Sequence, residues 1–184
     1  MLHGSGTTLQ SIIDSINDGE LEARINLVVS DNSNAYAIER AKKSNIDTYI
    51  INSKTREDID YELSSVLEKY KVDLIVLAGY LKMIGDRLIS NYRIINTHPS
   101  LLPKFGGKGM YGMKVHQAVW EAKENFTGPT IHFVNNEYDK GNIIIQTKIE
   151  VKDIDTPETI SAKVQAIEKI QLVETLKRFT KGEL

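Results

Sequence analysis

Leu74-Ile75-Val76-Leu77-Ala78 is the stretch that decides the fold, because five consecutive apolar residues are typical of a strand buried on both faces. Strands of this kind occur in parallel sheets that are covered by helices on either side. Similar apolar runs with β-branched residues occur at 25–30 and 48–51, and another begins at Ile94. Repeated buried strands of this length predict an α/β protein with its sheet in the interior.

The segments between these strands have the periodicity of amphipathic helices. Leu9, Ile12, Ile13 and Ile16 follow the i, i+3, i+4, i+7 spacing of one helical face, and Gly19 ends the pattern. Strand–helix alternation predicts a doubly wound, mostly parallel sheet. Further helices are expected from Ala35, after Thr55, over 115–123 and from Pro157, and further strands at 130–134 and 143–150.

The composition narrows the class of protein. The 184 residues predict one domain, 1–184, and the formal charge of -2 argues against a nucleic-acid binder with a broadly basic surface. There is no cysteine for disulfides or thiolate chemistry, and no apolar run near the ~18 residues of a membrane span. We therefore expect a soluble, cytoplasmic globular protein that is bound to neither nucleic acid nor membrane.

A glycine-containing turn, Gly4-Ser5-Gly6-Thr7-Thr8, precedes the first expected helix. Backbone N–H groups at a helix start bind phosphate well, and glycines let the ligand approach closely. The turn matches neither a Walker loop nor a full dinucleotide fingerprint. A phosphate site and an ordinary helix-capping turn both fit these residues.

The stretch Asn96-Thr97-His98-Pro99-Ser100-Leu101-Leu102-Pro103 has the strongest chemical pattern. Residues i and i+2 of a strand face the same side, so Asn96 and His98 project together at a strand's carboxyl end, where α/β sites form. An amide donor beside an imidazole suits acyl transfer, because the amide binds a developing oxyanion and the imidazole moves protons. The alternative is a turn-capping asparagine beside a core histidine.

The remaining titratable candidates lie further along the chain. Asp139 follows the expected strand 130–134 and a polar loop, so it either pairs with His98 and raises its pKa or serves as a turn residue. His132 lies in an apolar strand and is expected to be a core histidine. His116, on an amphipathic helix, is expected at the surface or in a supporting role, and His3 has no evident partner. No zinc-binding spacing is present.

These motifs together resemble the folate-dependent formyltransferases. The match includes Gly4–Thr8, the Asn96–Pro103 string, Thr130-Ile131-His132-Phe133-Val134 and Asp139-Lys140-Gly141, and so extends over nearly the whole chain. The Asn-x-His-Pro-Ser-Leu-Leu-Pro string with a downstream aspartate is highly specific to that family. The Gly-Ser-Gly turn and the length of the chain are similar to the glycinamide ribonucleotide branch.

The resemblance implies a Rossmann-like formyltransferase fold and an enzyme of purine biosynthesis. Such an enzyme transfers the formyl group of 10-formyltetrahydrofolate, a cosubstrate, to the glycine amine of 5-phosphoribosylglycinamide, with no tightly bound cofactor and no metal. The implied catalytic residues are Asn96, His98 and Asp139. The implied ribonucleotide contacts are Gly4, Ser5, Gly6, Thr7, Thr8, Arg56, Gln165 and Glu168. The implied folate contacts are Leu81, Lys82, Met83, Ile84, Val134, Asn135, Asn136, Glu137 and Tyr138.

Three departures from the family pattern leave alternatives open. Only Met1 and Leu2 precede His3-Gly4, so the first strand is expected to be truncated. The chain stops at Leu184, before the terminal hairpin of many members, and Lys169-Ile170-Gln171-Leu172 replaces the usual His-x-x-Tyr-Pro pattern. The short start makes a folate- or nucleotide-binding relative without turnover an alternative. A formyltetrahydrofolate deformylase, which has the same catalytic trio but normally an extra N-terminal regulatory domain, is another. A methionyl-tRNA formyltransferase is disfavoured without a C-terminal domain and basic character. We expect a monomer or weak homodimer.

Overall fold

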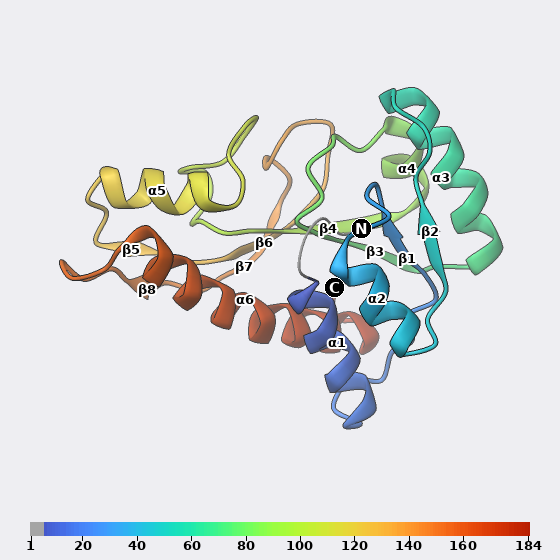
Figure 1. Cartoon of the computed structure of the whole chain (residues 1–184), viewed down its shortest axis with the longest axis horizontal. Helices are drawn as coiled ribbons and strands as arrows, with labels where there is room; N and C mark the ends of the chain where they lie inside the picture. Colours follow the sequence, from blue (N-terminus) through green and yellow to red (C-terminus); the bar gives the residue numbers. More distant parts are fainter. Residues whose placement is uncertain (1–5) are drawn as a thin grey trace. The chain divides into compact units, whose positions relative to one another are not determined.

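The computed structural model describes residues 6–184 and divides into two compact units, Met1–Ile95 and Asn96–Leu184. The expected truncated first strand, with His3, Gly4 and Ser5, lies outside the described residues. Helices and strands alternate along the first unit, whereas in the second unit four strands follow one another between α5 and α6 (Figure 1). The expected α/β class with a mostly parallel sheet is confirmed.

The first unit is built from helices that pack against short strands. Strands β1 and β2 pair in parallel, with Val28 opposite Thr48. Leu9 and Ile13 of the first helix pack with Val28 and Ile38 in one buried cluster, as their helical spacing predicts. The elements are α1 Thr7–Asn17, β1 Val28–Ser30, α2 Tyr36–Lys43, β2 Thr48–Ile50, α3 Arg56–Tyr70, β3 Leu74–Ala78 and α4 Asp86–Asn91. The next strand, β4 Arg93–His98, lies beside β3 and ends in the second unit.

In the second unit, the carboxyl end of β4 lies beside β6, and β6 pairs antiparallel with β7. The β6–β7 register shifts between Ile131 and His132. Ile160 and Val164 of the last helix pack with Val119 in a second buried cluster. The remaining elements are α5 Met113–Glu121, β5 Phe126–Thr127, β6 Thr130–Phe133, β7 Ile143–Gln146, β8 Ile149–Glu150 and α6 Pro157–Thr180.

Several element boundaries differ from the sequence expectation. The strand expected at 25–30 has only the three residues of β1, and the one expected at 143–150 is divided into β7 and β8. The division falls at Thr147, whose hydroxyl donates to Gln171 of α6 and whose amide donates to Pro129. Contacts with other segments therefore interrupt an apolar run that sequence periodicity treats as continuous.

Helix α4 was not expected from the sequence, because its start depends on a distant residue. Both carboxylate oxygens of Asp60, on α3, accept backbone N–H groups at this start, from Arg87 at 2.9 Å and Leu88 at 3.1 Å. Unpaired N–H groups at a helix start need such acceptors. A helix of six residues that is capped from elsewhere leaves no local signal.

None of the helices within residues 6–184 combines the length and the apolar character that a membrane span needs.

Candidate active site

Three polar residues of the second unit form one hydrogen-bonded cluster at the carboxyl end of β4. Asn96 and His98 lie two positions apart on β4, and Asp139 lies in the segment between β6 and β7. His98 is 4% exposed, and Asn96 is half-buried. Asp139 has a φ of 56°, a left-handed conformation that short polar side chains tolerate better than most. The expected pairing of Asp139 with His98 is present, but the expected rise of the His98 pKa is wrong, because burial of the ring outweighs the effect of the carboxylate.

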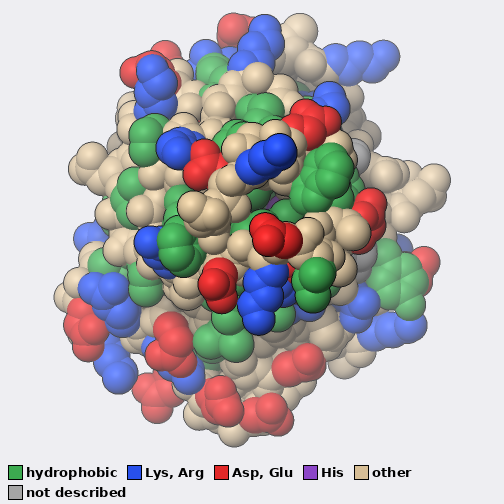
Figure 2. All heavy atoms as spheres, turned by 90° about the vertical axis from the view of Figure 1, so that its left-hand side faces the viewer, with side chains coloured by type: hydrophobic (Ala, Val, Ile, Leu, Met, Phe, Trp, Pro, Cys, Tyr) green, Lys and Arg blue, Asp and Glu red, His purple; other side chains and the backbone are tan. Residues whose placement is uncertain are grey.

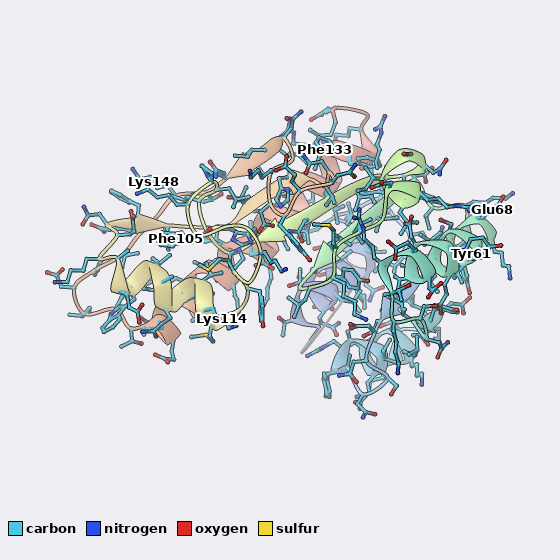
Figure 3. All side chains as sticks on the ribbon, turned by 90° about the horizontal axis from the view of Figure 1, so that it is seen from above. Tyr61, Glu68, Phe105, Lys114, Phe133 and Lys148 are labelled. Carbon is cyan, nitrogen blue, oxygen red and sulfur yellow. The ribbon has the colours of Figure 1, made fainter. Side chains whose placement is uncertain are left out.

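His98 has an acceptor at each ring nitrogen. Its Nδ1 lies 3.4 Å from Oδ2 of Asp139, and its Nε2 lies 2.8 Å from the carbonyl oxygen of Phe105. The carbonyl of Phe105, in the loop before α5 (Figure 3), only accepts, so Nε2 carries a hydrogen. The Nδ1···Oδ2 distance exceeds the ~2.9 Å of a normal N–H···O bond, so Nδ1 is held less tightly than Nε2, and Asp139 attracts it when the ring is protonated. Nδ1 is therefore the nitrogen at which a proton enters or leaves most easily.

The pKa values in this cluster reflect burial opposed by charge. Burial lowers the pKa of His98 more than Asp139 and the Phe105 carbonyl raise it, so the net shift is downward. For Asp139, burial alone raises the pKa, but His132, His98 and the Gly107 amide outweigh it and lower the pKa. Asp139 is therefore an anion at neutral pH, and it stabilises positive charge on His98.

The glycine-rich loop after β4 also contacts the cluster. The amide of Gly107 donates to Oδ2 of Asp139 at 2.9 Å. A Cβ atom added at Gly106 would lie 2.5 Å from Leu102 Cδ2 and 3.3 Å from Asp139 Cβ. This close approach favours glycine at position 106, and the neighbouring Gly107 amide holds the Asp139 carboxylate.

His132 is a member of the site that the sequence did not identify. It is 2% exposed, as expected of a core histidine, but its Nε2 lies 3.1 Å from Asn96 Nδ2 and 3.5 Å from Asp139 Oδ1. Its Nδ1 lies 2.8 Å from the carbonyl oxygen of Phe133. In the sequence, the hint was a polar side chain within an apolar strand. Because β6 lies beside β4, the His132 side chain reaches Asn96 and takes part in the site.

His116 of α5 is also buried, at 2% exposed, so the expectation that it lies at the surface is wrong. Burial, followed by repulsion from His98, lowers its pKa to about 4, so the ring is neutral at physiological pH. Within the part of the chain that the structure describes, its Nδ1 has no hydrogen-bond partner. His116 therefore supports the site as a neutral packing residue.

The expected ribonucleotide contacts lie in both units. Gly4 and Ser5 lie outside the described residues, Gly6 is the N-cap of α1, and Thr7 and Thr8 begin that helix. A Cβ atom at Gly6 would lie 2.7 Å from Ala37 Cα, so this glycine permits close packing on α2. Arg56 donates to the carbonyl of Ile84 at 2.9 Å and to Asp86 at 3.0 Å. Gln165 and Glu168 lie on α6, where Gln165 donates to Ser161.

The expected folate contacts also come from two segments. The first segment, 81–84, follows β3, and there Lys82 lies 3.3 Å from Asp31 while Ile84 is buried. The second segment, 134–138, follows β6, and there Asn135 accepts the amide of Glu137. Leu81, Met83, Val134, Asn136 and Tyr138 are the other members.

The cluster of Asn96, His98 and Asp139 has the components of an acyl-transfer site. It combines an amide N–H donor, an imidazole and a carboxylate that stabilises the imidazolium. In residues 6–184 no group of three or more potential metal ligands is placed to hold an ion. Lys, Arg, Asp and Glu side chains are interspersed on the face that carries α5, β5 and β8 (Figure 2), with no extended area of one sign.

Comparison with known proteins gives consistent matches. The family model described as formyl transferase matches residues 1–176. A phosphoribosylglycinamide formyltransferase of Haemophilus influenzae is 36% identical over 100% of this chain and 87% of its own length. The chloroplastic enzyme of that name from Arabidopsis thaliana is 42% identical over 88% of this chain, and the match covers 57% of that relative.

Solved structures of formyltransferases also have the fold of this chain. The phosphoribosylglycinamide formyltransferase of Bacillus halodurans has a TM-score of 0.88 at 33% identity, covering 96% of this chain and 91% of that one. The glycinamide ribonucleotide transformylase 1 of Symbiobacterium toebii has a TM-score of 0.91 at 33% identity, covering 98% and 85% of the two chains. The shared fold therefore extends over both units of the chain.

Proposed function

The chain belongs to the formyl transferase family, and from this premise we propose that it transfers a formyl group to the amine of 5-phosphoribosylglycinamide in purine biosynthesis. The donor is 10-formyltetrahydrofolate, a cosubstrate that is released as tetrahydrofolate. The observation that carries this proposal is the cluster in which Asp139 lies within hydrogen-bond distance of Asn96 and within ion-pair distance of His98. The names of the relatives support the choice of acceptor.

The proposed reaction exchanges one bond to the formyl carbon for another. The glycine amine attacks the formyl carbon, and the bond from that carbon to the folate nitrogen breaks. Asn96 Nδ2 donates to the oxygen that becomes negative, a contact typically worth ~2.7–4 kcal/mol in such sites. The amine loses a proton and the departing folate nitrogen gains one. His98 moves this proton at Nδ1. Of the two polar contacts of the His98 ring, the one from Nδ1 to Asp139 is longer than the one from Nε2 to the Phe105 carbonyl.

The binding regions follow from the family resemblance. We propose that the ribonucleotide phosphate binds at Gly4–Thr8, with Arg56, Gln165 and Glu168 as further contacts, and that folate binds at 81–84 and 134–138. We also propose that one formyltransferase domain comprises residues 1–184, that the protein is a cytoplasmic monomer or weak homodimer, and that it needs no tightly bound cofactor.

The test is a spectrophotometric assay of tetrahydrofolate release from 10-formyltetrahydrofolate with and without 5-phosphoribosylglycinamide. Release that requires the ribonucleotide supports the proposal. Release at the same rate without the ribonucleotide would identify a hydrolase instead. No release, with folate binding retained in calorimetry, would contradict any formyl transfer by this chain.

A further inference from the structure

The hydrogen bonds of His132 define which of its ring nitrogens carries a hydrogen. Its ring is buried in β6, and buried polar atoms need partners. Nδ1 lies 2.8 Å from the carbonyl oxygen of Phe133, which can only accept. The hydrogen is therefore on Nδ1, and in the neutral ring Nε2 is left as an acceptor.

This acceptor faces the side-chain amide of Asn96. Asn96 Nδ2 lies 3.1 Å from His132 Nε2, so one amide N–H donates to the ring. If the amide were rotated by half a turn, Oδ1 would face Nε2, and two acceptors would be in contact. The Phe133 carbonyl thus fixes the tautomer of His132, and the tautomer in turn fixes the orientation of the Asn96 amide.

We propose that His132 is a positioning residue that holds the Asn96 amide with Nδ2, rather than Oδ1, available to the reacting oxygen. An asparagine amide has two N–H groups, and His132 takes only one of them. The second points to Asp139 Oδ1, with Nδ2 and Oδ1 3.5 Å apart, a long hydrogen bond that an incoming formyl oxygen can replace. This second N–H is the donor for the formyl oxygen, so the inference rests on the proposed function.

The effect of losing this restraint is on turnover more than on binding. The terminal torsion of asparagine is broad and roughly two-fold, so an unrestrained amide also populates the orientation that presents Oδ1. Removing an oxyanion donor outright costs about 10²–10³-fold in kcat. Loss of orientation alone removes only part of that contribution. We therefore expect kcat to fall about tenfold, with KM for both substrates unchanged.

Two substitutions of His132 separate positioning from packing. His132→Gln can place its Oε1 near the position of Nε2 and keep an acceptor for Asn96, whereas His132→Asn is too short to reach it. We expect His132→Gln to retain most of the wild-type kcat and His132→Asn to lose about tenfold. In an Asn96→Ala background the two variants of His132 should give equal rates, because the group to be positioned is gone. Equal losses in both single variants, repeated in that background, would overturn the inference.

A readout independent of turnover keeps this test separate from that of the proposed function. Nitrogen-15 NMR of the wild-type imidazoles reports which nitrogen carries the hydrogen. We expect the Nδ1–H tautomer for His132, and an Asn96 amide resonance displaced in His132→Asn but not in His132→Gln. A hydrogen on Nε2 instead would overturn the positioning role, even in an active enzyme. If the wild type shows no ribonucleotide-dependent turnover, the proposed function fails, and these spectra still decide how Asn96 is held.

Discussion

Replacing Asp139 by asparagine removes the charge that opposes the burial of His98. The carboxylate lies 3.4 Å from His98 Nδ1, and the two side chains are 12% and 5% exposed. At an effective dielectric constant of about 20, unit charges at that separation attract by roughly 5 kcal/mol. The net downward shift of the His98 pKa indicates that burial already outweighs this attraction. Asp139→Asn should therefore lower the pKa of His98 further.

The consequence for turnover follows from that energy. If about 3–5 kcal/mol of the attraction between Asp139 and His98 stabilises the transition state, kcat falls in Asp139→Asn roughly a hundredfold to a few thousandfold, at 1.36 kcal/mol per factor of ten. The assay is kcat and KM for both substrates as a function of pH. The limb of the pH profile that reports His98 should move to lower pH in the variant.

A matched control is available in the same unit. Asp153 is exposed, so Asp153→Asn changes the net charge equally without touching the cluster, and it should leave kcat unchanged. His98→Ala combined with Asp139→Asn should be little worse than His98→Ala alone, because residues that act as a unit are not additive. Unchanged kcat in Asp139→Asn, or fully additive losses in the double variant, would refute the reasoning.

Three further predictions concern the donor, the hairpin and acid stability. Asn96→Ala should lower kcat about 10²–10³-fold with little change in either KM, and steady-state kinetics at saturating folate will check this. Gly141→Ala should lower the free energy of unfolding in urea by at least about 2 kcal/mol, because its Cβ would lie 1.7 Å from the carbonyl oxygen of Phe133; an unchanged midpoint would contradict this. The pKa of Asp155 is held at about 2, below its ordinary 3.8, by a backbone N–H and the Lys163 ammonium. Its contribution to stability is therefore complete above about pH 4 and lost as the pH falls toward 2, so Lys163→Met should destabilise the protein at pH 7 and flatten that loss in acid unfolding curves.

Features that depend on local sequence were predicted well. The strand expected at Leu74–Ala78 is β3, although only Ile75 and Leu77 are fully buried, and the helix expected from Pro157 begins there as α6. Its start is fixed by a capping box between Thr156 and Thr159, a purely local arrangement. The common orientation of Asn96 and His98 likewise follows from the two-residue period of a strand. Propensity and periodicity suffice for such features because each involves neighbours along the chain.

Features that depend on strand register or loop path were not predictable in this way. The contact of His132 with Asn96 requires β6 to lie beside β4 in one register, which a single sequence does not specify. The Gly107 amide reaches Asp139 across 32 residues of chain. Burial of His116 likewise depends on how α5 packs rather than on its own pattern. The sequence could therefore name the catalytic candidates, while the groups that position them needed the structure.

The central claim is that the Asn96, His98 and Asp139 cluster transfers a formyl group to an amine of the ribonucleotide, and following a labelled formyl carbon tests it most directly. The enzyme is supplied with 5-phosphoribosylglycinamide and 10-formyltetrahydrofolate carrying carbon-13 in the formyl group, and the products are identified by NMR and mass spectrometry. The account predicts that the label appears in an amide of the ribonucleotide, at a rate greatly reduced in Asn96→Ala and Asp139→Asn. Label recovered only as formate, or transfer at the wild-type rate in both variants, would contradict it.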